Sequence, residues 1–192
     1  DTNRNKEFMS IDNFEEVIEK IHKYTNLVLL HVKGEPLLHN RLEDILNILE
    51  KYNLKANITT NGTLIKDNLE ILKRSKVVRQ INFSLHSSTQ NEEFGNQYLK
   101  YIFESADKLK DIIISYRLWN LKDIKDNDIN LEIIKSLEEY YNIQNLKQRL
   151  SENDFLKIKE NVFINQDIEF TWPDINKEEI IHSGKCLALK EQ

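Results

Sequence analysis

Apolar residues spaced three and four positions apart alternate along the chain with short, unbroken apolar runs. The first spacing is typical of a helix with one buried face, and the second is typical of a strand buried on both faces. We predict helices around residues 14–21, 42–49, 65–74, 94–102 and 133–140. We predict strands over residues 27–33, 56–60, 81–85 and 112–118.

Capping patterns mark the starts of two of these helices, and the periodicity of apolar residues becomes weaker after the last helix. The positions of Asp12 and Glu15 predict a capped amino end for the first helix. Asn40 and Glu43 have the spacing of a capping box before the second helix. After the last of these helices the pattern indicates a short helix and then one strand or a hairpin, over residues 151–159 and 162–170.

The predicted strands alternate with helices, and several begin about 30 residues apart, which is the length of one strand–helix unit. Repeated units of this kind form a parallel sheet covered by helices. The sheet is either doubly wound or closed into a barrel, and the apolar pattern does not choose between them. In both arrangements ligands bind at the carboxyl ends of the strands, so these ends are the places to look for a site.

Polar segments follow the first two predicted strands. The first strand ends in KGEP, where a glycine lets a ligand approach the backbone and Glu35 lies at the mouth of the sheet. A carboxylate and backbone carbonyls at this place suit a cation or an ammonium group. The second strand ends in TTNGT, whose side chains donate and accept hydrogen bonds. Taken alone, each segment fits an ordinary turn before a helix better than a binding site.

The next two strand ends also carry side chains suited to a ligand. Ser84 and His86 share one face of the third strand, which is the interior face if the sheet forms a barrel. A lone histidine is more often a satisfied core residue than a catalyst. The fourth strand ends near Arg117. This residue either binds a carboxylate or phosphate of a ligand or forms a salt bridge with a neighbouring helix, and the sequence favours neither. Together, the four polar strand ends predict one ligand site.

Composition excludes several classes of protein. The 192 residues have a net charge of −5 and no block of Lys and Arg, which argues against nucleic-acid binding. The longest apolar run is only as long as a strand, which argues against a membrane span. Cys186 is the only cysteine, so no disulfide and no cysteine cluster forms within this chain. We therefore expect a protein of the reducing cytoplasm.

Three segments in this order resemble the radical S-adenosylmethionine (SAM) superfamily. HVKGEPLLH resembles the segment that carries the glycine-glycine-glutamate motif, and NITTNGTL and INFSLHS resemble the next two strand ends. Residues 8–10 resemble the stretch after the family's cysteine loop, and residues 172–173 and 184–189 resemble the bridge to a SPASM-type auxiliary domain. The resemblance implies an α/β fold, a partial (β/α)6 TIM-like barrel without its first strand over residues 1–170, and a bridge over residues 171–192.

By this resemblance, the cofactor-binding residues would be Gly34, Glu35, Thr60, Asn61, Ser84 and Arg117. The first two would hold the methionine amino group of SAM, the middle two would lie near the same ligand, and the last two are candidates for its ribose and carboxylate. The adenine would rest against the backbone of residues 119–120, and His86 would face the substrate.

Two departures from the family pattern affect these expectations. Lys33 replaces the first glycine of the motif, although its carbonyl is still available. No C-x-x-x-C-x-x-C is present, so the three thiolates that would hold a [4Fe-4S] cluster are missing, and we expect them to precede Asp1 in the parent protein. Cys186 is either a leading cysteine of the auxiliary domain or a free thiol.

The resemblance implies that the full-length parent is a radical SAM enzyme. It would use SAM, a [4Fe-4S] cluster and an electron donor to generate a deoxyadenosyl radical, which abstracts hydrogen from an unknown substrate, with a peptide as the leading candidate. We expect this chain alone to hold no cluster and to be inactive. Two alternatives stay open: a degenerate, non-catalytic module that binds a nucleoside or peptide, and an unrelated enzyme with a metal held by Glu35, His31 and His39.

Overall fold

The computed structural model of the chain contains one sheet of six strands and describes residues 7–31, 34–86, 92–119 and 128–167. Along the sheet the strands follow the order β1-β2-β3-β4-β6-β5. The neighbours from β1 to β6 in this order pair in parallel, whereas β5 pairs antiparallel with β6. The strands span Leu27–Leu30 (β1), Lys55–Thr60 (β2), Val78–Ser84 (β3), Ile113–Trp119 (β4), Phe155–Lys159 (β5) and Val162–Asp167 (β6).

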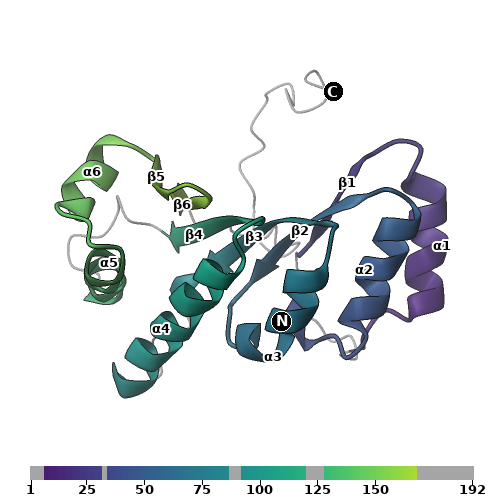
Figure 1. Ribbon diagram of the computed structural model, residues 1–192, viewed down its shortest axis with the longest axis horizontal. Helices are drawn as coiled ribbons and strands as arrows, with labels where there is room; N and C mark the ends of the chain where they lie inside the picture. Colours follow the sequence, from purple (N-terminus) through teal and green to yellow (C-terminus); the bar gives the residue numbers. More distant parts are fainter. Residues whose placement is uncertain (1–6, 32–33, 87–91, 120–127, 168–192) are drawn as a thin grey trace, which may run out of the picture.

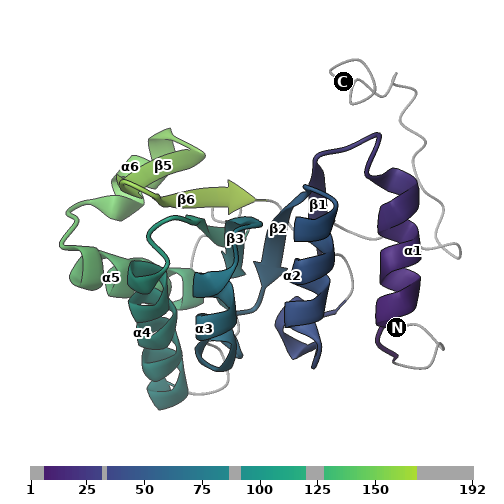
Figure 2. The same ribbon diagram turned by 45° about the vertical axis from the view of Figure 1, so that its right-hand side comes forward.

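Helices connect the parallel strands. In Figures 1 and 2, α2, α3 and α4 lie side by side along the sheet, and α1 packs beside α2. The helices span Ile11–Ile21 (α1), Leu42–Lys51 (α2), Ile65–Arg74 (α3), Glu92–Lys108 (α4), Asp128–Tyr141 (α5) and Leu146–Glu152 (α6), and Pro36–Leu38 form a 3-10 helix, η1. This confirms the predicted α/β fold of a partial barrel. The barrel is not closed, because β1 and β5 form the two edges of the described sheet.

Alternation along the strands places large apolar side chains under the helices. Ile58 of β2, Phe83 of β3 and Tyr116 of β4 have no exposed surface. They belong to one core cluster with residues of the helices, among them Leu49 of α2 and Ile102 of α4. The opposite face of the same strands therefore carries the intervening polar residues. Among the described residues, no helix combines the length and apolar character needed to cross a membrane.

The first predicted helix cap is wrong. Ser10, not the pair Asp12 and Glu15, caps α1, because its side-chain oxygen accepts a hydrogen bond from the Asn13 amide at 3.2 Å. Ser10 has an extended backbone (φ −65°, ψ 153°), which a capping side chain requires. Asp12 already lies within the first helical turn, where its charge favours the amino end of the helix without capping it.

The predicted capping box before α2 is also wrong. Arg41, one residue beyond Asn40, occupies the N-cap position, and no side chain makes a capping hydrogen bond there. Glu43 instead forms an ion pair with Arg74 of α3 at 3.3 Å. The helix therefore begins one residue later than its sequence pattern indicates.

The predicted short helix over residues 151–159 is replaced by a helix end and a strand. α6 ends at Glu152, and β5 begins at Phe155 and turns back into β6. From Leu156 to Lys159 apolar and polar residues alternate, and Leu156 and Ile158 pack against the core. Phe155 stacks on Phe163 of β6 with ring centroids 5.1 Å apart. This cross-strand packing favours the hairpin over a helix.

Candidate functional site

The carboxylate of Glu35 connects the ends of the first two strands. Its Oε1 accepts hydrogen bonds from the Leu37 amide at 3.0 Å and from the Thr60 hydroxyl at 2.6 Å. Its Oε2 accepts a hydrogen bond from the Asn61 amide at 2.8 Å. Leu37 belongs to η1, which follows β1 in the chain, whereas Thr60 is the last residue of β2. One side chain thus joins two loops at the carboxyl edge of the sheet.

The local sequence explains why Glu35 turns back toward η1. Gly34 has φ 127°, a backbone conformation that other residues rarely adopt. Glu35 occupies the N-cap position of η1, and Pro36 occupies the first helical position, where a missing N–H costs nothing. The carboxylate therefore caps the short helix through the Leu37 amide and reaches β2 with its remaining acceptor capacity.

A tightly bonded turn follows β2. The Thr60 side chain is buried, and its Oγ1 accepts a hydrogen bond from the Gly62 amide at 2.9 Å. The Asn61 Oδ1 accepts hydrogen bonds from the amide of Thr63 at 2.9 Å and from its hydroxyl at 2.7 Å. The turn carries its own hydrogen bonds, so its polar groups keep defined positions.

Tyr98 of α4 connects the ends of β2 and β3. Its hydroxyl donates to the carbonyl of Asn61 and also contacts the carbonyl of Ser84 at 3.3 Å. The sequence pattern marked Tyr98 only as part of a helical face, because no motif surrounds it. The usable signal is general: a buried tyrosine needs a partner for its hydroxyl, and polar strand ends provide one.

The remaining predicted site residues lie on the third and fourth strands or just beyond. Ser84 and Arg117 are direct partners in the register of β3 and β4, so their side chains share one face of the sheet. The His86 ring lies with Nε2 3.0 Å from Oδ1 of Asn130, a buried residue of α5. Glu35, Thr60 and Asn61 thus contact one another directly, and Ser84 joins them through Tyr98. The predicted adenine contact at residue 120 lies outside the described residues.

The described residues give no support to a metal site around Glu35, His31 and His39. The Nε2 of His39 lies 3.1 Å from the Met9 carbonyl, and its Nδ1 lies 3.1 Å from the Arg41 amide. Both ring nitrogens therefore have protein partners. Among the described residues, no three His, Cys, Asp or Glu side chains form a group that could hold a metal ion. The bridge over residues 171–192, with its cysteine at 186, lies outside the described residues.

A family model matches most of the chain. The model of the radical SAM superfamily covers residues 1–133, which include β1 to β4 and the whole Glu35 network. No curated protein matches the sequence.

Solved structures of SuiB from Streptococcus suis share the fold of this chain. The structure of SuiB bound to S-adenosylmethionine aligns with a TM-score of 0.51 and 16% identity over 88% of this chain and 45% of SuiB. The structure of SuiB bound to the precursor peptide SuiA aligns with a TM-score of 0.52 and 15% identity over 88% of this chain and 44% of SuiB. The chain therefore spans less than half the length of these proteins.

Proposed function

Because the chain belongs to the radical SAM superfamily, we propose that the carboxyl end of its sheet binds S-adenosylmethionine. The observation that carries this proposal is the Glu35 carboxylate between the ends of β1 and β2. A carboxylate offers about four acceptor positions, and donors among the described residues use three of those on Glu35. The position left on Oε2 suits the ammonium of the methionine group.

Gly34 supports this assignment by leaving space beside the backbone. Apart from Gly34 and its two neighbours in the chain, no described atom lies within 4 Å of the place where a Cβ of residue 34 would be. A ligand can therefore approach the turn closely. In our proposal the adenine lies farther along the same edge of the sheet, against the backbone of residues 119–120.

Ser84 and Arg117 complete the proposed site on the next two strands. A guanidinium binds a carboxylate through two parallel hydrogen bonds, which suits the methionine carboxylate. The Ser84 hydroxyl donates and accepts hydrogen bonds, which suits a ribose diol. Since the two residues are register partners, their backbones are separated by one strand spacing, roughly 4.8 Å. One ligand can contact both.

The residues of this chain do not fit an iron–sulfur cluster. Such a cluster needs several cysteine thiolates, and the chain has one cysteine. We propose that the parent protein provides the cluster and receives electrons from a donor, and that this chain alone is inactive. SAM bound in the parent supplies radical chemistry that removes a hydrogen atom from a substrate. The role of this chain is to bind and orient the SAM molecule.

We propose a peptide as the substrate of the parent enzyme. The support is the SuiB structure, which contains a precursor peptide and shares the fold of this chain. In this proposal His86 faces the substrate, and its hydrogen bond with Asn130 orients the ring.

We also propose that the protein is cytoplasmic. Its single cysteine suits the reducing conditions of that compartment.

Replacing Glu35 with glutamine tests the site. A charge-assisted hydrogen bond to an ammonium contributes about 1.5–3 kcal/mol, so we expect Glu35→Gln to weaken SAM binding about tenfold or more. Isothermal titration of SAM into the 192-residue chain measures this. Binding of 5′-methylthioadenosine, which has no amino-acid group, should not change.

The matched control is Glu43→Gln, which changes an exposed carboxylate of α2 that pairs with Arg74. This variant should bind SAM like the unmodified chain. Equal SAM affinity in the Glu35→Gln variant and the unmodified chain would contradict the proposed role of Glu35.

The single cysteine favours a second candidate function, a non-catalytic module that binds a nucleoside or a peptide. Iron and sulfide analysis of the anaerobically purified parent protein separates the two functions. Both elements in the parent support the enzyme, and their absence supports the module.

A further inference from the structure

The hydroxyl of Thr60 makes two hydrogen bonds, one as a donor and one as an acceptor. It donates to Oε1 of Glu35 at 2.6 Å, and it accepts a hydrogen bond from the Gly62 amide at 2.9 Å. A threonine hydroxyl carries a single proton. Because that proton goes to Glu35, Thr60 cannot donate a hydrogen bond to a ligand.

The side chain of Thr60 also lies on the core side of β2. It shares this face with Ala56 and Ile58, which have no exposed surface, and Thr60 itself is 2% exposed. The neighbours Thr59 and Asn61 alternate to the opposite face and are half-buried. Burial thus keeps the Thr60 hydroxyl away from a ligand but within reach of the Glu35 carboxylate.

The Gly62 amide, which donates a hydrogen bond to Thr60, has a defined position as well. Gly62 has φ 77°, and a Cβ at this residue would lie 2.6 Å from Cδ1 of Ile102. The turn therefore requires glycine, and the Gly62 amide points at Thr60. A chain of two hydrogen bonds thus runs from the turn after β2 through Thr60 to Glu35.

From these contacts we propose that Thr60 is a positioning residue that acts on SAM through Glu35. Its hydroxyl holds Oε1, and the Asn61 amide holds Oε2, so that the carboxylate keeps one acceptor position for the ligand ammonium. This role rests on the proposed SAM site. It replaces the direct SAM contact that the family resemblance implies for Thr60.

The test compares Thr60→Val with Thr60→Ser in the full 192-residue chain. Valine keeps the branched shape but removes the hydroxyl, whereas serine keeps the hydroxyl. We expect Thr60→Val to weaken SAM binding about fivefold or more, and Thr60→Ser to stay within about twofold of the unmodified chain. Binding of 5′-methylthioadenosine should stay unchanged in both variants, because it has no ammonium.

Thr25→Val is the matched control. The Thr25 hydroxyl also makes two hydrogen bonds: it donates to the carbonyl of Leu27, at the opposite end of β1, and accepts from the amide of the same residue. This variant loses a similar set of contacts and should bind SAM normally. If Thr60→Val does not fold, as judged by circular dichroism, Thr60→Ala and Thr60→Ser provide the same comparison.

The outcomes separate the positioning role from the site itself. Weaker SAM binding in Glu35→Gln with unchanged binding in Thr60→Val overturns the positioning role and leaves the site intact. A chain that binds no SAM in any form overturns the site. Hydrogen exchange of the Leu37 and Asn61 amides gives a readout without ligand: both should exchange faster in Thr60→Val, and unchanged protection overturns the role of Thr60 in holding Glu35.

Discussion

Gly62 lies at a turn of the candidate site where a side chain has no room. An added Cβ would lie 2.6 Å from Cδ1 and 3.0 Å from Cγ1 of Ile102, and 3.1 Å from Cδ1 of Phe83. We expect Gly62→Ala to lower the free energy of unfolding by about 2 kcal/mol, from the positive φ and the crowding together. Denaturant unfolding followed by circular dichroism measures the change.

A double-mutant cycle with Ile102→Val separates the contribution of crowding to this loss of stability from the contribution of the positive φ. The Ile102→Val change removes Cδ1, the atom nearest to the added Cβ. If crowding contributes, Gly62→Ala should cost about 1 kcal/mol less in the Ile102→Val background. The same cost in both backgrounds would assign the whole effect to the φ of Gly62.

At this scale the sequence predicted which residues meet, but not the hydrogen bonds that they form with one another. Parallel strands end at one edge, so the meeting of Glu35, Thr60 and Asn61 followed from the order of strands and helices. The partners of Glu35 did not follow, because they depend on the φ of Gly34 and on distances across the sheet. Tyr98 was missed because its hydroxyl reaches two carbonyls that only the packing of α4 brings close.

At the scale of elements, the start of α1 provides a direct test of local structure. The Ser10 side chain caps the helix, whereas Asp12 lies inside the first turn. We expect Ser10→Ala to lower the free energy of unfolding by about 1 kcal/mol. Asp12→Ala should lower it by about half as much or less, through its charge at the helix end. Chemical denaturation of both variants measures the two changes, and a larger loss for Asp12→Ala would contradict the assigned cap.

Two other elements, α3 and β5, show why the bounds of helices and strands can be predicted only in part from the sequence. α3 spans Ile65–Arg74, as the apolar spacing predicts, because its buried face is continuous. β5 was predicted as a helix, because its five residues are too few to separate a period of two from a helical period. Its identity depends on pairing with β6, which is a contact between elements and not a local preference.

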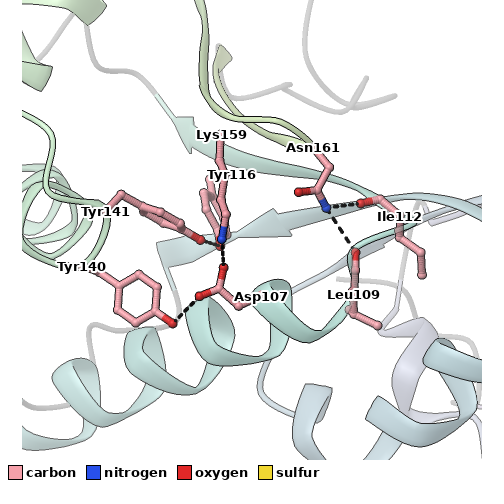
Figure 3. A network of polar contacts seen from close by, with 8 residues as sticks. All are labelled: Asp107, Leu109, Ile112, Tyr116, Tyr140, Tyr141, Lys159 and Asn161. Atoms are coloured by element: carbon pink, nitrogen blue, oxygen red, sulfur yellow. Dashed lines mark hydrogen bonds and ion pairs between the residues drawn. The ribbon is translucent and has the colours of Figure 1, made fainter.

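At the scale of the whole molecule, contacts around Asp107 join three elements (Figure 3). Asp107 at the end of α4 accepts hydrogen bonds from Lys159 of β5 at 2.6 Å and from the Tyr140 hydroxyl of α5 at 2.9 Å. Beside it, the hydroxyls of Tyr116 on β4 and Tyr141 on α5 lie 2.7 Å apart. This network attaches the β5–β6 hairpin and α5 to the part of the chain that carries the candidate site.

The tyrosines of this network should make the fold sensitive to alkali. Burial, together with the hydrogen bond to Asp107, raises the pKa of Tyr140 to about 12. Burial also raises the pKa of Tyr116 and of Tyr141 above the ordinary value. In the unfolded chain a tyrosine ionises near pH 10, about the ordinary value. Above that pH the unfolded chain binds fewer protons than the folded one, so stability falls as pH rises.

We therefore expect the stabilisation from protonated Tyr140 to be complete below about pH 10 and to be lost as the pH rises through about 12. In a titration of tyrosinate absorbance, Tyr116, Tyr140 and Tyr141 should ionise together with the loss of helical circular dichroism, because their hydroxyls are released when the α4–α5–β4 packing opens. The chain unfolded in guanidinium chloride should titrate in one phase. In a Tyr140→Phe variant, one tyrosine fewer should ionise together with unfolding. Ionisation of all seven tyrosines before unfolding would show that this network does not hold the fold together.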